Sequence, residues 1–143
     1  REIRAGSSQG KIALTLSVFV PKPFTPFQWQ PMLEKKELTA RIKLVRDGLR
    51  GVYGVSVSAE SPRLAHLQGF LAQGDRRLAP VLERMLNVKS WERAAREAGV
   101  VPSWYTLRDK REDEVLPWDF IDSGNARDEL FKRGQKALAL ISG

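Results

Sequence analysis

The chain has 143 residues, enough for one domain or one and a half small ones, and its 42% hydrophobic and 29% charged residues are ordinary for a soluble globular domain. A net charge of +7 permits contact with nucleic acid or another polyanion but does not require it, because the charges are spread along the chain. The absence of cysteine excludes disulfides, thiolate zinc sites, iron–sulfur ligation and a thiol nucleophile within these residues.

No apolar run approaches the length of a membrane span, and no basic segment followed by an apolar one predicts a signal peptide. We therefore expect a cytoplasmic protein with no membrane partner. The sequence begins with Arg1 and not with Met, which is consistent with a fragment or a trimmed chain.

Alternating side chains predict a β-strand near the start of the chain. Residues 1–10 are polar and rich in Gly and Ser, so we expect a loose lead-in, and the alternation then runs from Lys11 to Val20. One face of this strand is bulky and apolar and suits packing against helices. The other face, with Ala13, Thr15, Ser17 and Phe19, is mostly small and mildly polar. It suits either a ligand cavity or close packing, or else a solvent-exposed surface.

The strand runs into an unusual stretch in which Pro21, Pro23 and Pro26 are followed by aromatic residues. Each proline fixes its own φ and pushes the preceding residue toward extended geometry. The stretch therefore predicts a stiff, extended arm that leaves the sheet. Arms of this kind often shape the mouth of a site.

A helix and a second strand follow the arm. Apolar spacing predicts the helix from Glu34 to Gly48, and alternation predicts the strand from Val52 to Ala59. The order strand, helix, strand is that of a βαβ-like unit, with a right-handed crossover if the two strands are parallel.

The rest of the chain is predicted to be helical. Cap and stop signals indicate helices that begin at Ser61, Asp75, Ser90, Pro102 and Asn125, and Pro80 should delay or kink the second of them. The predicted fold class is α+β, with a small sheet from the βαβ-like unit packed with four to five helices. We place the strands, the arm and the first helix in residues 1–60, and a C-terminal helical region in residues 61–143.

Several side chains are candidates for binding, each with a structural alternative. Lys22, between two prolines, could meet a phosphate or carboxylate, or it could be solvated. The aromatic rings of Phe24, Phe27 and Trp29 could stack on a planar ligand or base, or they could pin the arm to the core.

The charged candidates follow the same division. The arginines of the Asp75-Arg76-Arg77 run could grip an anion or a neighbouring carboxylate, or the run could be a helix cap followed by solvated arginines. Asp119 and Asp122 could act as a carboxylate pair, but capping and turn roles are favoured because no histidine or metal-ligand set is nearby.

Other titratable residues are predicted to be structural. His66 reads as a partly buried histidine of a helix, and residues 108–113 as a charged, solvated connector. Glu112, Asp113 and Glu114 are predicted to be a solvated charge run. We assign no catalytic residue and no metal ligand.

Three segments together resemble a known family. The arm segment, Phe19–Trp29, looks like the FVPKPxTPFQW stretch of radical SAM (S-adenosylmethionine) proteins that carry an N-terminal cobalamin-binding domain. The GDRR segment, Gly74–Leu78, looks like their RGDRR segment, and the LPW segment, Asp113–Gly124, is similar to their DEVLPWDHIDxG. The three occur in the family's order and run from near the start to near the end of the chain. A shorter version of the arm also recurs in radical SAM methylthiotransferases.

The resemblance implies a fragment of a radical SAM oxidoreductase-type enzyme of unassigned substrate. The full-length protein would bind S-adenosylmethionine and a [4Fe–4S] cluster, through three cysteines early in a partial (β/α) barrel, and its use of cobalamin stays open. This cysteine-free chain would be the C-terminal part, without a cofactor and inactive alone, with the rest of the same polypeptide as its partner. Its first strand would be the last barrel strand, with the small-residue face toward the lumen.

The resemblance also implies two groups of site residues. The group on the substrate side of the barrel is Pro21, Lys22, Pro23, Thr25, Pro26, Phe27 and Trp29. The group that holds the helical region against the core, or meets an anion, is Asp75, Arg76, Arg77, Trp118, Asp119 and Asp122. Two features depart from the family: Phe24 stands where histidine is common, and the segment between Met85 and Trp91 is shorter than usual.

Two other classes of function stay open. The positive charge and the aromatic arm would suit a basic module that presents RNA, or tRNA, to a catalytic partner. The third class is a purely structural or dimerising domain.

Overall fold

The computed structural model describes residues 10–142, which contain a parallel two-stranded sheet and six α-helices and are therefore α+β, as predicted. Most of the predicted lead-in, residues 1–9, lies outside the described residues. The chain divides into two compact units. The strand unit comprises residues 10–19 and Leu33–Ala65, and the helical unit comprises Val20–Met32 and the residues from His66 onward.

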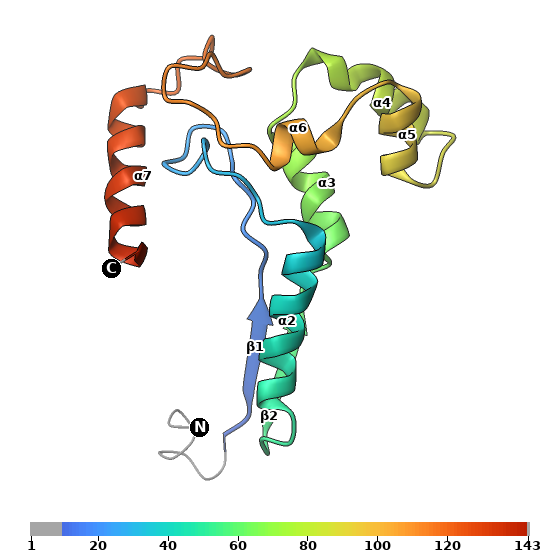
Figure 1. Cartoon of the computed structure of the whole chain (residues 1–143), viewed down its shortest axis with the longest axis vertical. Coiled ribbons are helices and arrows are strands. Elements are labelled where there is room, and N and C mark those ends of the chain that lie inside the picture. Colours follow the sequence, from blue (N-terminus) through green and yellow to red (C-terminus); the bar gives the residue numbers. More distant parts are fainter. Residues whose placement is uncertain (1–9, 143) are drawn as a thin grey trace. The chain divides into compact units, whose positions relative to one another are not determined.

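The strand unit is the predicted βαβ-like unit. Its elements are β1 (Ile12–Leu16), α2 (Lys35–Leu49) and β2 (Val55–Ala59), and α2 lies beside β2 (Figure 1). The two strands pair in parallel, with Ile12 opposite Val55 and Leu16 opposite Ala59.

The two faces of this sheet differ as the alternation predicts. Along both strands the bulky apolar side chains are half-buried, whereas the opposite face, with Ala13, Thr15, Ser56 and Ser58, is exposed. On the exposed face the hydroxyls of Thr15 and Ser58 form a hydrogen bond of 3.0 Å across the strands. β1 ends earlier than predicted because the Val18 N–H donates to the Glu60 carboxylate at 2.9 Å and not to a neighbouring strand.

The helical unit is built from short helices. α3 begins at Pro62, as its Ser-Pro start signal predicts, and most of it belongs to this unit. Pro80 lies at the start of α4, where the missing N–H of proline is tolerated, so the helix begins late as expected. The elements are α3 (Pro62–Ala72), η1 (Arg76–Leu78), α4 (Ala79–Met85), α5 (Trp91–Glu97), α6 (Pro102–Thr106) and α7 (Arg127–Ser142).

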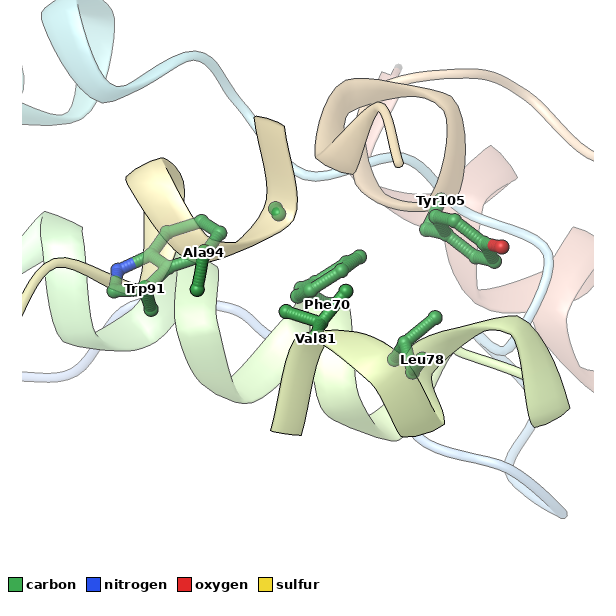
Figure 2. Packing of buried hydrophobic residues seen from close by; sticks show 7 residues of the cluster. Phe70, Leu78, Val81, Trp91, Ala94 and Tyr105 are labelled. Atoms are coloured by element: carbon green, nitrogen blue, oxygen red, sulfur yellow. The ribbon is translucent and has the colours of Figure 1, made fainter. Parts of the chain in front are cut away.

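The first hydrophobic core of the helical unit surrounds Phe70 (Figure 2). The Phe70 ring stacks on Trp91 with 5.6 Å between centroids and meets Tyr105 edge-on at 5.5 Å. Gly74 is required beside this core, since a Cβ there would lie 2.1 Å from a Leu78 methyl and 2.9 Å from the Phe70 carbonyl oxygen. The buried members are Phe70, Leu78, Val81, Trp91, Ala94, Ala95 and Tyr105.

The predicted cap of the last helix is wrong. α7 begins at Arg127, two residues after Asn125, and the Asn125 amide donates to the Ser123 carbonyl at 3.4 Å. The chain is still in a turn there, because Gly124 has φ +71° and its N–H donates to the Asp122 carboxylate at 2.8 Å. The local turn therefore takes precedence over the capping motif.

α7 approaches the arm closely at a glycine. A Cβ on Gly134 would lie 2.2 Å from the Pro26 carbonyl oxygen, so only glycine permits this contact between helix and arm. Gly134 is buried although it stands in the middle of a helix, where glycine is unfavourable by about 1 kcal/mol relative to alanine.

We expect Gly134→Ala to destabilise the helical unit by about 1–3 kcal/mol, because the added Cβ overlaps a backbone atom that cannot yield easily. The matched control is Gly48→Ala in α2, where nothing lies within 4 Å of an added Cβ. The control should leave stability unchanged or raise it by up to about 1 kcal/mol. Urea unfolding followed by circular dichroism compares the two. A Gly134→Ala protein at least as stable as the wild type would contradict the close approach.

Candidate functional site

The arm does not stay extended. Residues 23–29 form consecutive turns, so the predicted stiff, extended arm is wrong over most of its length. The Thr25 hydroxyl donates to the Lys22 carbonyl at 2.8 Å, and the Gln28 N–H donates to the Thr25 carbonyl at 3.1 Å. Phe24 has φ +58°, a left-handed conformation that is uncommon for a bulky residue and reverses the chain between two prolines.

One buried amide connects the arm to the LPW segment. Gln28 is 2% exposed, and its Oε1 accepts two hydrogen bonds, from the Phe24 N–H at 2.9 Å and from the Trp118 indole N–H at 2.7 Å. The first bond closes the turn of the arm and the second fixes the indole of a residue ninety positions later. A single side chain thereby sets both the shape of the arm and its partner.

A second hydrophobic core forms around this connection. Trp29 and Phe131 meet edge-on with 5.2 Å between centroids, and Trp29 is 2% exposed. The ring of Trp29 is therefore not available to a ligand. Its buried position matches the structural alternative, in which the aromatic ring pins the arm to the core. The buried members of the core are Trp29, Leu116, Trp118 and Leu130.

The aspartates of the LPW segment hold loops together. The Asp119 carboxylate accepts the Leu116 N–H at 2.7 Å and pairs with Arg127. Asp122 accepts the Gly124 N–H, as described above. These are the capping and turn roles that the sequence favoured over a carboxylate pair.

A cavity of about 230 Å³ lies between the arm, the LPW segment and α7. Gln28 and Trp118, the two partners of the hydrogen bond described above, line this cavity. The ion pair of Asp119 and Arg127 lines it as well. The complete lining is Phe24, Gln28, Trp118, Asp119, Ile121, Ser123, Asn125, Arg127 and Leu130.

The GDRR segment begins with a cap. The Asp75 carboxylate accepts the Arg77 N–H at 2.8 Å and also pairs with the Arg77 guanidinium at 2.6 Å, which lowers the pKa of Asp75. The Tyr105 hydroxyl donates to the same carboxylate at 3.4 Å. Both Arg76 and Arg77 are exposed, and Arg77 is engaged by a carboxylate of its own segment. The run is arranged as a cap, and Arg77 has its own counter-ion.

A second cavity, of about 210 Å³, lies between the GDRR segment, α6 and the beginning of the LPW segment. Arg108 pairs with Glu114 at its wall, and the Arg108 guanidinium lies 4.3 Å from the centroid of the Trp104 ring. The lining is Gln73, Asp75, Arg77, Trp104, Tyr105, Arg108, Lys110, Glu114, Val115, Leu116 and Pro117.

The connector of residues 108–113 and the adjoining charge run that ends at Glu114 are not fully solvated, which corrects the sequence-based expectation. Lys110 is 8% exposed, its N–H donates to the Trp29 carbonyl at 3.1 Å, and its ammonium donates to the Tyr105 carbonyl at 3.2 Å. Glu114 is half-buried in its ion pair with Arg108. The connector is buried here because its backbone bonds to the arm, a contact that charge composition does not reveal.

The sequence analysis did not single out Gln28, Gln73 and Lys110, which are buried polar residues. Gln28 lies between two aromatic residues, and this position is the one local signal of its burial. Gln73 precedes Gly74 and Lys110 stands in a charged run, and neither position indicates burial. Gln73 is 1% exposed and its Nε2 donates to the Pro21 carbonyl at 3.0 Å. With this bond, residues next to the GDRR segment also meet the arm.

The remaining candidates have structural surroundings. Lys22 is half-buried. Its backbone carbonyl accepts the hydrogen bond from the Thr25 hydroxyl, and its ammonium takes no part in that bond. His66 is 5% exposed on α3, more deeply buried than the sequence predicted. Pro21 is buried, and Pro23, Thr25, Pro26 and Phe27 are half-buried along the turns of the arm.

Comparisons with models of protein families, with curated proteins and with solved structures find no match to this chain. Within residues 10–142 no three His, Cys, Asp or Glu side chains are grouped so that they could hold a metal ion. None of the helices described for these residues is long and apolar enough to cross a membrane.

We expect Gln28→Ala to destabilise the helical unit by about 2–3 kcal/mol, because it leaves the Phe24 N–H and the Trp118 indole N–H without their acceptor. Gln30→Ala, on the same arm and half-buried, is the control and should stay within about 0.5 kcal/mol of the wild type. Urea unfolding by circular dichroism measures both. Equal effects of the two substitutions would refute the role of Gln28.

Lys110 makes stability depend on pH in a defined direction. Burial lowers the pKa of Lys110 from 10.5 to about 8, and the charge of Arg108 acts in the same sense, while Glu114 and Asp109 oppose it. The folded protein therefore gives up this proton before the unfolded chain does. The contribution of Lys110 to the free energy of unfolding is therefore lowest below pH 8. It rises as the pH increases from about 8 to about 10.5.

Lys110→Met should consequently be more stable than the wild type at pH 7, by up to about 3 kcal/mol, with the difference shrinking toward pH 10. Lys89→Met, at an exposed lysine of the same unit, should show no such trend. Unfolding free energies at pH 7 and pH 10 test this. A difference between Lys110→Met and the wild type that is the same at both pH values rules the linkage out.

Proposed function

We propose that this chain is the C-terminal region of a radical SAM enzyme of the Fe–S oxidoreductase type. The observation that carries the proposal is that the three segments of the resemblance meet in the helical unit. Gln28 of the arm binds Trp118 of the LPW segment, and Gln73, next to the GDRR segment, binds Pro21 of the arm. Chance similarity in three short stretches gives no reason for those stretches to share hydrogen bonds and a core.

The sheet gives a second, independent support. Within residues 10–142 it consists of β1 and β2 alone, so each strand has one edge without a backbone partner in that part of the chain. Parallel strands normally belong to larger sheets that are covered on both faces. Neighbouring barrel strands from the preceding part of the same polypeptide would cover such an edge.

The iron–sulfur cluster of the family does not fit these residues, since cluster iron is bound by cysteine thiolates and the chain has no cysteine. We therefore assign the cluster, the S-adenosylmethionine site and any cobalamin site to the rest of the polypeptide, and no reaction step to this chain. The proposed part of the chain is to shape the substrate side of the barrel through its arm. A cytoplasmic location belongs to the same proposal.

The test is the full-length gene product. We expect it to contain a Cys-x3-Cys-x2-Cys motif before residue 1, to show iron–sulfur absorbance when purified without oxygen, and to cleave S-adenosylmethionine reductively. The present chain, expressed alone, should do neither. A full-length protein without the motif and without a cluster would overturn the proposal.

The alternative of RNA binding has one observation in its favour, the basic surface of α2. Lys43, Arg46 and Arg50 line an open hollow of about 500 Å³ between α2 and residues 59–62. The hollow is also lined by two acidic residues, Glu60 and Asp47, and Asp47 pairs with Arg50. If RNA binds there, affinity falls steeply and linearly on a log–log plot against salt, and Lys43→Glu weakens it. Binding no tighter than that of a protein of equal charge dismisses this alternative.

A further inference from the structure

The cavity of about 210 Å³ in the helical unit holds an unusual cation. Lys110 is 8% exposed, and its ammonium, which has three hydrogens to donate, makes one recorded hydrogen bond, to the Tyr105 carbonyl. Lys110 makes no ion pair within the described residues. A buried charge of this kind is costly unless something pairs with it.

The other charges of the cavity are already matched. Arg77 pairs with Asp75, and Arg108 pairs with Glu114. The cavity is thus left with one uncompensated positive charge, that of Lys110. A ligand with a single negative charge would neutralise it, whereas a doubly charged phosphate would bring one charge too many.

Apart from Gln73, the rest of the wall is apolar and aromatic. Val115, Leu116 and Pro117 come from the LPW segment, and the Trp104 ring, 47% exposed, comes from α6. Cavities for drug-sized ligands are larger, roughly 300–1,000 Å³, so this one suits a smaller molecule with an apolar body.

We propose that this cavity binds a small organic monocarboxylate, with its carboxylate on the Lys110 ammonium and its apolar body against Trp104 and Pro117. The site is separate from the cluster chemistry proposed above and does not depend on it. Gln73 lines the same cavity, and among the described residues its Oε1 has no hydrogen-bond partner. A ligand that also carries an N–H or O–H near that oxygen would therefore bind better than one without.

The experiment uses the present chain and three probes: benzoate, the neutral benzamide of the same shape, and inorganic phosphate. Nuclear magnetic resonance follows the indole N–H of Trp104 in each titration. We expect benzoate to shift this signal in a saturable way, and benzamide and phosphate to bind at least about tenfold more weakly, the loss typical of a hydrogen bond to a charged group.

Two variants locate the binding. Lys110→Met should weaken benzoate at least about tenfold, and Lys89→Met, at an exposed lysine, should leave the affinity unchanged. Lys110→Met that binds benzoate as the wild type does, or benzamide that binds as well as benzoate, overturns the proposal. An adequate fold of each variant is checked by circular dichroism.

The wild-type protein gives an independent test that does not require a folded variant. Benzoate binding should weaken between pH 7 and pH 10 as Lys110 loses its proton. The other titratable groups of the cavity wall do not account for such a change. Ion pairing raises the pKa of Arg77 and Arg108 and lowers the pKa of Asp75 and Glu114, and burial raises the pKa of Tyr105. An affinity that does not change over this range refutes the assignment of the carboxylate to Lys110.

Discussion

The two hydrogen bonds accepted by Gln28 Oε1 are the constraint on which the helical unit depends. One closes the turn of the arm at Phe24 and the other holds the Trp118 indole, so the local shape of one segment and its long-range pairing share an atom. Buried polar groups of this kind stabilise a structure only when they are satisfied, and they specify one arrangement, since any other leaves donors unpaired. The aromatic core around Trp29 packs beside the turn and the indole that these two hydrogen bonds hold in place.

Close contacts at two glycines also position parts of the helical unit. Gly74 lets the chain turn against Phe70 and Leu78, and Gly134 lets α7 lie against Pro26. At both places a side chain would force helix and neighbour apart.

Local signals in the sequence predicted much of the fold. The Asp75 and Ser90 side chains cap the residues that follow them, and Pro80 marks the start of α4, because each acts on its own turn. The sequence could not reveal that Lys110 is buried or that the arm turns at Phe24. The burial of Lys110 depends on a contact with Trp29, far away in the chain, and a charged run does not reveal it. The turn at Phe24 is closed by nearby side chains, but a proline pattern is compatible with an extended arm as well as with a turn.

The division of the chain into two units has a spectroscopic consequence. The four tryptophans, at positions 29, 91, 104 and 118, all fall in the helical unit, and the strand unit contains Tyr53 but no indole. Tryptophan fluorescence, excited at the red edge of the absorption band, therefore monitors the helical unit selectively. A denaturation step that dichroism detects and emission does not would belong to β1, α2 and β2, so two ordinary signals can separate the melting of the two halves without a label.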